Sequence, residues 1–112
     1  MPACRRCPPV SPEDAAARAR AREHLTRARR TGAELAASGR LGDELTPVLE
    51  EAVLPQIDAA IADLDDPEVP LEAIARLSAS LPDAVLALSG PLGLAPGLRP
   101  VHEDVVKGLA AL

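Results

Sequence analysis

We predict an all-α fold for this sequence, a small helical bundle of about four or five helices. Three observations support this. Apolar residues recur at spacings of three and four along several segments, which is the periodicity of an amphipathic helix. Pro and Gly separate these segments, and none of them alternates as a strand does. The 112 residues make one domain, and 47% hydrophobic content lies in the globular range.

The first helix is expected from Pro12 to about Ala37. Ser11 is a good N-cap, Pro12 suits the first helical position, and two acidic residues follow at the positive end of the helix dipole. Gly32 is a weak point that costs about 1 kcal/mol relative to Ala. The segment 38–42, with two glycines, predicts the break after this helix.

The second helix has the clearest pattern, and we expect it to begin at Thr46-Pro47 with Thr46 as the cap. Its apolar positions are Leu45, Val48, Leu49, Ala52, Val53, Ile57, Ala60, Ile61 and Leu64. Pro55 lies inside the pattern, where it lacks an N–H and clashes with the carbonyl of Glu51. We therefore expect a kink, or two shorter helices that meet there.

Three shorter helices complete the prediction. One begins near Asp66 or Pro70 and carries a narrow apolar stripe through Leu81, and a short one runs over 82–88. A Gly/Pro loop over 89–100 precedes a last amphipathic helix over 101–112. The loop contains three leucines, which we expect to fold back on the core: Leu92, Leu94 and Leu98.

The composition divides the chain at residue 40. Residues 41–112 hold 25 of the 28 Leu, Ile and Val residues. We therefore predict a basic N-terminal tail and Arg-rich helical arm over 1–40, and an acidic helical core domain over 41–112 that folds without the arm.

The two parts carry opposite charge. Residues 1–40 hold nine arginines against four carboxylates, a net charge of +5, whereas residues 41–112 hold three basic residues against thirteen carboxylates, a net charge of −10. Such asymmetry indicates a charged partner or self-association.

The Arg-rich helix supplies the candidate partner-binding residues. At 100° per residue three of its arginines share one face, and small apolar residues form a narrow uncharged seam that permits close helix packing. The predicted binding residues are Arg18, Arg22, Arg29, Ala21, Leu25, Ala28 and Leu35. Three interpretations stay open: a solvated helix docked by its seam, a helix that binds an acidic protein surface, and a helix over 18–30 that contacts nucleic-acid phosphates.

Metal, cofactor and catalytic patterns are weak. Cys4 and Cys7 have the spacing of half a zinc site, but a second pair is missing, so two free thiols are expected, with a zinc shared between chains or a redox role as alternatives. The acidic stretch 63–68 departs from a calcium-binding loop and is interpreted as a helix junction in which Asp66 caps the next helix. We predict no metal and no cofactor, and neither His24 nor His102 stands in a catalytic pattern.

One electrostatic detail of this acidic stretch predicts a contact. Asp63 and Asp65 fall at the negative end of the second helix's dipole, which is unfavourable unless cations lie near. The arginines of the first helix are the expected source of these cations.

The function predicted from these observations is non-enzymatic: a protein-protein interaction or assembly protein whose basic arm docks on an acidic surface of a partner or of a neighbouring copy. The alternative is a small nucleic-acid-associated factor that uses the Arg-rich helix on phosphates. The sequence contains no Phe, Trp or Tyr, which removes the usual platforms for stacking nucleobases. No stretch suits a membrane span or a secretion signal, and two cysteines provide no disulfide framework, so a cytoplasmic location is expected.

Overall fold

A computed structural model describes residues 12–88 and 97–112. Its helices are α2 (Pro12–Ser38), α3 (Gly42–Val48), the π-helical segment η1 (Leu49–Val53), α4 (Leu54–Asp65), α5 (Leu71–Leu77), α6 (Leu81–Leu86) and α7 (Leu98–Ala110). Within these two ranges no strand occurs, and the all-α prediction is confirmed.

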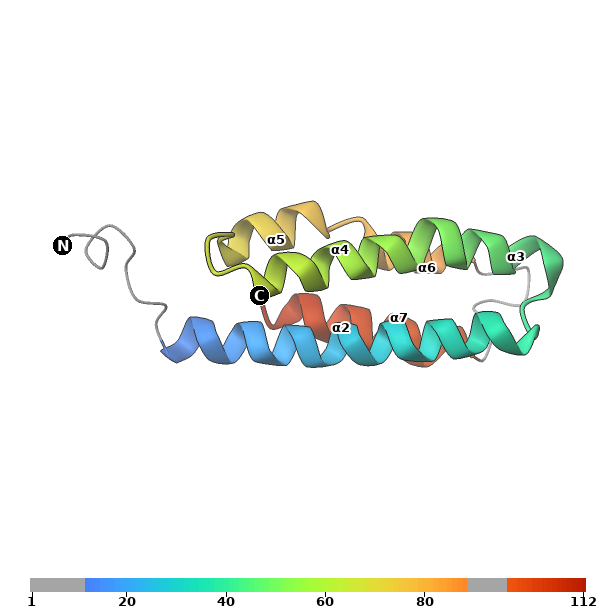
Figure 1. The fold of residues 1–112 in the computed structure, drawn as a ribbon, viewed down its shortest axis with the longest axis horizontal. Coiled ribbons are helices and arrows are strands. Elements are labelled where there is room, and N and C mark those ends of the chain that lie inside the picture. The colour runs from blue at the N-terminus through green and yellow to red at the C-terminus, as the bar shows by residue number, and fades with distance from the viewer. Residues whose placement is uncertain (1–11, 89–96) are drawn as a thin grey trace.

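The helices form a four-rod bundle. The rods are α2, the continuous run α3–η1–α4, the pair α5–α6, and α7, and the chain reverses direction from each rod to the next (Figure 1). α2 packs against α7 on one side and against α4 on the other, while α5 packs on α4 and α6 on α7. This is the up-down-up-down arrangement of a small helical bundle.

α2 begins and ends close to its predicted bounds. It starts at Pro12, as expected, with Glu13 and Asp14 in its first turn, while the expected cap Ser11 lies outside the described residues. The helix ends at Ser38, and Gly39 follows with φ of +76°. Gly adopts this left-handed conformation without the Cβ penalty of other residues, which explains why the helix stops there.

The second rod differs from its prediction at the start. It begins at Gly42, four residues before Thr46, and no side chain caps it, so Thr46 is not its N-cap. Pro47 lies inside α3. Because two acidic side chains occupy the first turn, where the helix dipole favours negative charge, the added turn is stabilised at its positive end.

Pro55 is accommodated by a change of helix type. The π-helical segment η1 ends two residues before it, and the N–H of Leu54 bonds to the carbonyl of Leu49, five residues back. A π-helical turn widens the backbone where Pro55 cannot donate to the carbonyl of Glu51. The rod therefore continues into α4 rather than dividing into two separate helices.

The last helix begins earlier than predicted. α7 starts at Leu98 rather than Val101, and Leu98 is fully buried, which confirms that this leucine folds back on the core. Leu92 and Leu94, like Cys4 and Cys7, lie outside the described residues, so the predictions for them stay open.

All four rods contribute to one hydrophobic core. Its fully buried large side chains include Leu25 of α2, Ile57 of α4, Leu81 of α6 and Val105 of α7. A Cβ on Gly108 would lie 3.3 Å from the carbonyl oxygen of Ala21, so the backbones of α7 and α2 approach closely. α2 is thus packed along the bundle. Residues 12–38 share one core with residues of the range 41–112, for which the sequence predicts a separate core domain.

No helix within the described ranges 12–88 and 97–112 is both long and apolar enough to cross a membrane.

Candidate interaction surface

The seven predicted binding residues all lie on α2, where four are buried in the core and three arginines contact α4 or the turn after it. Ala21, Leu25 and Ala28 are fully buried, and Leu35 is 7% exposed. The seam therefore packs against other helices of the same chain, as the first of the three interpretations of this helix expected.

Arg18 binds the end of α4. Its guanidinium donates hydrogen bonds to the carbonyl oxygens of Leu64 at 3.2 Å, Asp66 at 3.3 Å, and Val69. These carbonyls lie at and just after the C-terminus of α4, where the helix leaves acceptors unpaired and the dipole favours a cation. Arg18 thus supplies donors to the α4–α5 connection, although its buried Nε has no partner within the described part of the chain.

Arg22 and Arg29 form ion pairs with α4. Arg22 contacts both carboxylate oxygens of Asp65, at 2.6 and 3.3 Å, and Arg29 Nε lies 2.8 Å from Asp58 Oδ1. The hydrogen bond from Arg22 lowers the pKa of Asp65 below its ordinary value, and the same bond raises the pKa of Arg22. The prediction that arginines of the first helix lie near Asp63 and Asp65 is confirmed for Asp65, whereas Asp63 has no arginine partner within residues 12–88 and 97–112.

The face of α2 that carries Arg18, Arg22 and Arg29 is therefore engaged within the chain. The seam is covered by α4 and α7, and these three arginines already have acceptors on α4 and the turn after it. Partner binding by these residues would require the partner to compete with contacts that the bundle already makes. Partner binding by these residues stays a prediction, and the solvent side of α2 is the stronger candidate.

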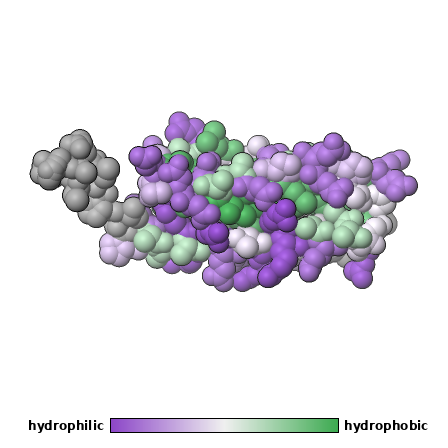
Figure 2. Space-filling view, viewed as in Figure 1, coloured by the Kyte–Doolittle hydropathy of each residue, from purple (hydrophilic) through white to green (hydrophobic). Residues whose placement is uncertain are grey.

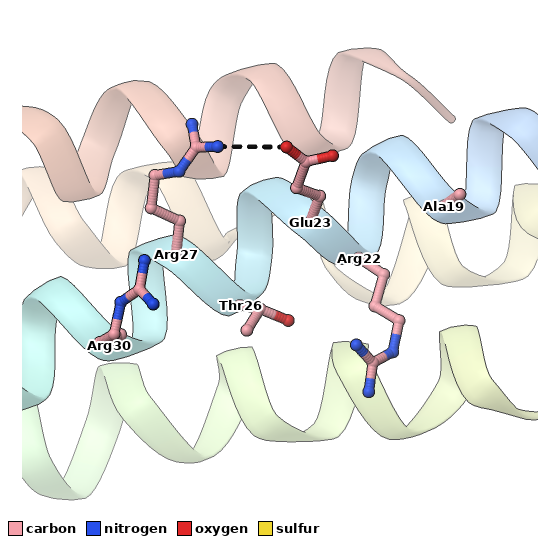
Figure 3. Close-up of a pocket in the computed structure, with 6 residues that line it drawn as sticks. All are labelled: Ala19, Arg22, Glu23, Thr26, Arg27 and Arg30. Atoms are coloured by element: carbon pink, nitrogen blue, oxygen red, sulfur yellow. Dashed lines mark hydrogen bonds and ion pairs between the residues drawn. The ribbon is translucent and has the colours of Figure 1, made fainter.

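The solvent side of α2, adjacent to the face that carries Arg22, has an open depression of about 470 Å³. Its lining residues are Ala19, Arg22, Glu23, Thr26, Arg27 and Arg30. Figure 3 shows Arg22 pointing toward α4, whereas Glu23 and Arg27 join on the side of α7. Arg30 is drawn beside them without a contact to the other five residues. The depression is thus lined by the small side chains of Ala19 and Thr26, and three of its other four lining residues are arginines.

Two exposed arginines of α2 have no carboxylate partner in the described ranges, Arg20 and Arg30. By contrast, Arg27 lies 3.2 Å from Glu23 and 3.5 Å from Asp104. An exposed guanidinium with unused donors can bind a carboxylate or a phosphate in bidentate fashion. The solvent side of α2 therefore retains donors that the bundle does not use.

A polar cluster between α2 and α7 was missed by the sequence analysis. His24 Nδ1 lies 3.3 Å from Asp104 Oδ1, and Arg27 lies against the same oxygen, while the Asp104 side chain is only 11% exposed. The available signal was the position of Asp104 beside Val101 and Val105 on the apolar side of the last helix. The contacts of His24 and Arg27 with Asp104 link α2 to α7.

The acidic stretch after α4 forms a turn. Asp66 Oδ1 accepts a hydrogen bond from the N–H of Glu68, whereas α5 begins later, at Leu71, and has Pro70 before it. The prediction that Asp66 caps the next helix is therefore wrong, because the side chain bonds a backbone N–H two residues on, as Asp commonly does in turns. Within residues 12–88 and 97–112, no cluster of three or more His, Cys, Asp or Glu side chains has a metal-binding arrangement.

The fold defines the class of this protein as a small all-α bundle. Comparisons with known protein families, with curated proteins and with solved structures each found no match.

Proposed function

We propose that this chain is a non-enzymatic interaction protein that binds an acidic protein surface through the solvent side of α2. The binding residues would be Arg20 and Arg30, on the side of α2 that carries Ala19 and Thr26, while Arg27 stays paired with Glu23 and Asp104. In this proposal Arg18, Arg22 and Arg29 hold α2 on the bundle, and their contacts fix the orientation of the free face.

One observation carries the proposal: the arginines of α2 divide into an engaged set and a free set. Arg22 and Arg29 are paired with α4, while Arg20 and Arg30 are exposed without a described carboxylate partner. A free cation on an ordered helix adds no cost for ordering the backbone on binding, and only the side chain itself is immobilised, at about 0.5–1.5 kcal/mol.

Charge favours an acidic protein rather than a nucleic acid as the target. The whole chain has a net charge of −5, so the basic face lies on an acidic molecule. A polyanion as long as duplex DNA would meet this surrounding negative charge, whereas a compact acidic patch would meet only the α2 face. A reducing cytoplasmic location is part of the same proposal, since Cys4 and Cys7 are interpreted as free thiols.

The test uses a fluorescent Glu-rich helical peptide as the probe, with Arg20→Glu/Arg30→Glu as the variant. Arg76→Glu/Arg99→Glu is the matched control, because both residues are exposed and lie on other helices. We expect the α2 variant to bind the peptide about tenfold more weakly than the wild type, which corresponds to about 1.4 kcal/mol, and the control within about twofold. Equal losses in both variants would show a general charge effect and contradict the proposal.

A parallel titration with a short DNA duplex decides the alternative function. Nucleic-acid binding that is stronger than peptide binding, and that falls steeply with salt, would support the nucleic-acid-associated factor instead. Binding of neither probe by the wild type would contradict both functions.

A further inference from the structure

We propose that the acidic surface that occupies the α2 depression belongs to a second copy of this chain, and that it is the face of α3–η1 around Val48. This inference rests on the proposed function, because it uses the same basic face of α2. It adds the identity of the partner and the residues that the partner contributes.

The proposed occupant is an exposed apolar residue with acidic neighbours. Val48 is 41% exposed, which makes it one of the few large apolar side chains on the described surface. Glu44 lies one helical turn before it, and Glu51 and Ala52 lie one turn after it, so these residues are neighbours on the surface of the rod. The face is therefore a small apolar protrusion that is flanked by two carboxylates.

The rod that carries this face is strongly acidic. Residues 42–65 contain seven carboxylates and no Lys, Arg or His. Asp58 and Asp65 pair with α2 of the same chain, whereas Glu44 and Glu51 are exposed and have no basic partner within residues 12–88 and 97–112. These two carboxylates are available to a cation from outside the chain.

The depression on α2 is complementary to this face. Ala19 and Thr26 leave room for a side chain of the size of Val, and Arg30 stands at the edge with its donors unused. Glu23 would repel the carboxylates of the partner, but Arg27 lies 3.2 Å from the Glu23 carboxylate and offsets its charge. A valine between two carboxylates would thus meet Ala19 and Thr26, with Arg30 in the lining of the depression and Arg20 exposed on the same helix outside it.

A single chain cannot join its own two faces. α3 lies at one end of the bundle, beyond the region of α2 that contains residues 19–30 (Figure 1), and the face seen in the space-filling view is mostly polar with scattered apolar patches (Figure 2). Two copies of the acidic face would repel each other if they met directly. The contact therefore joins unlike faces, so that the Val48 face of one copy meets α2 of another copy.

Charge reversal with cross-rescue tests this pairing. The two variants are Arg20→Glu/Arg30→Glu on α2 and Glu44→Arg/Glu51→Arg on the acidic face, measured alone and as an equimolar mixture by sedimentation equilibrium at low salt. We expect the average mass of the wild type to rise with concentration, each variant alone to stay near the 11.6 kDa of one chain, and the mixture to associate again. Association returns because each variant keeps the face that the other has lost.

The matched control is Glu72→Arg/Glu103→Arg, which reverses two exposed carboxylates away from the proposed contact and should associate as the wild type does. Helical circular dichroism checks the fold of every variant. Val48→Ser is a second variant that removes the apolar contact without changing charge, and it should weaken association at least severalfold.

The outcomes separate this inference from the proposed function. A wild type that binds the Glu-rich peptide but stays monomeric at millimolar concentration overturns the second copy as the partner and leaves the function standing. A wild type that does neither overturns both. The pairing is also overturned if both charge-reversal variants still associate when each is measured alone, or if their equimolar mixture stays monomeric.

Discussion

The two sides of α2 use the same residue type in opposite ways. On the side toward α4, Arg22 and Arg29 meet Asp65 and Asp58 at 2.6 and 2.8 Å. On the solvent side, Arg20 and Arg30 have no carboxylate partner within residues 12–88 and 97–112. The comparison teaches that the packing of α2 decides which arginines are paired. A guanidinium that faces α4 forms ion pairs within the chain, whereas one that faces solvent keeps its donors unused, although the local sequence around both is similar.

The largest expected effect is the loss of α2 itself. The sequence analysis predicted that residues 41–112 fold alone, but the shared core changes the expected outcome of a deletion of residues 1–40. Removing α2 exposes apolar side chains of α4 and α7 to water, so we expect the cooperative thermal melt to disappear. Circular dichroism of the deletion variant checks this, and a sharp helical melt would restore the two-part organisation.

Leu25→Ala should give the next largest effect. Leu25 is fully buried in the core, so the change should lower the free energy of unfolding by about 2–5 kcal/mol. Thr26→Ala, on the solvent side of the same helix, should change it by less than about 0.5 kcal/mol. Urea unfolding of both variants measures the contrast, and similar losses would show that α2 is not oriented as described.

Arg18→Met should separate an engaged arginine from a free one. The change removes the donors to the carbonyls of Leu64 and Asp66 but keeps much of the aliphatic stem, and it should cost about 1–3 kcal/mol in unfolding free energy. Arg20→Met, the matched change on an arginine without such acceptors, should be nearly neutral. Comparable values for the two variants would contradict the assignment of Arg18 to the end of α4.

The smallest expected effect is the pH dependence of the Arg22–Asp65 pair. Because the hydrogen bond from Arg22 lowers the folded-state pKa of Asp65, the pair stabilises the fold above the unfolded-state pKa, at about pH 4, and this stabilisation is lost as the pH falls through the lowered value. Asp65→Asn should therefore unfold more easily than the wild type at neutral pH, and the difference should shrink in acid. Urea midpoints at neutral pH and in acid measure it, and a difference that grows in acid would contradict the pairing.

Several features of the fold followed from local sequence patterns. The positions of Pro12 and Gly39 placed both ends of α2, and the apolar spacing placed α4 and α7. The start of the second rod did not follow, because a Pro near a helix start is typical but not required, and acidic residues allowed one more turn before Pro47. The π-helical segment could not be predicted either. It forms because the helical rod continues past Pro55, and the local sequence pattern does not decide whether the rod continues.

The candidate surface was predictable only in part. The Arg-rich helix and its seam were visible in the sequence, since both are properties of one helix. Which of the arginines would be free was not visible, because Asp58 and Asp65 lie 29 and 43 residues away from their partners along the chain. The His24–Asp104 contact spans 80 residues and was hidden for the same reason.

The sequence by itself determined the all-α class, most helix positions and the excess of positive charge on the first helix, because hydrophobic periodicity, proline, glycine and charge act locally or over one helical turn. The tertiary structure decided that this helix is part of the core rather than an arm, and which of its faces stays exposed. Those outcomes depend on packing between segments that are far apart in the chain, and one helix carries no information about the partner that will cover it.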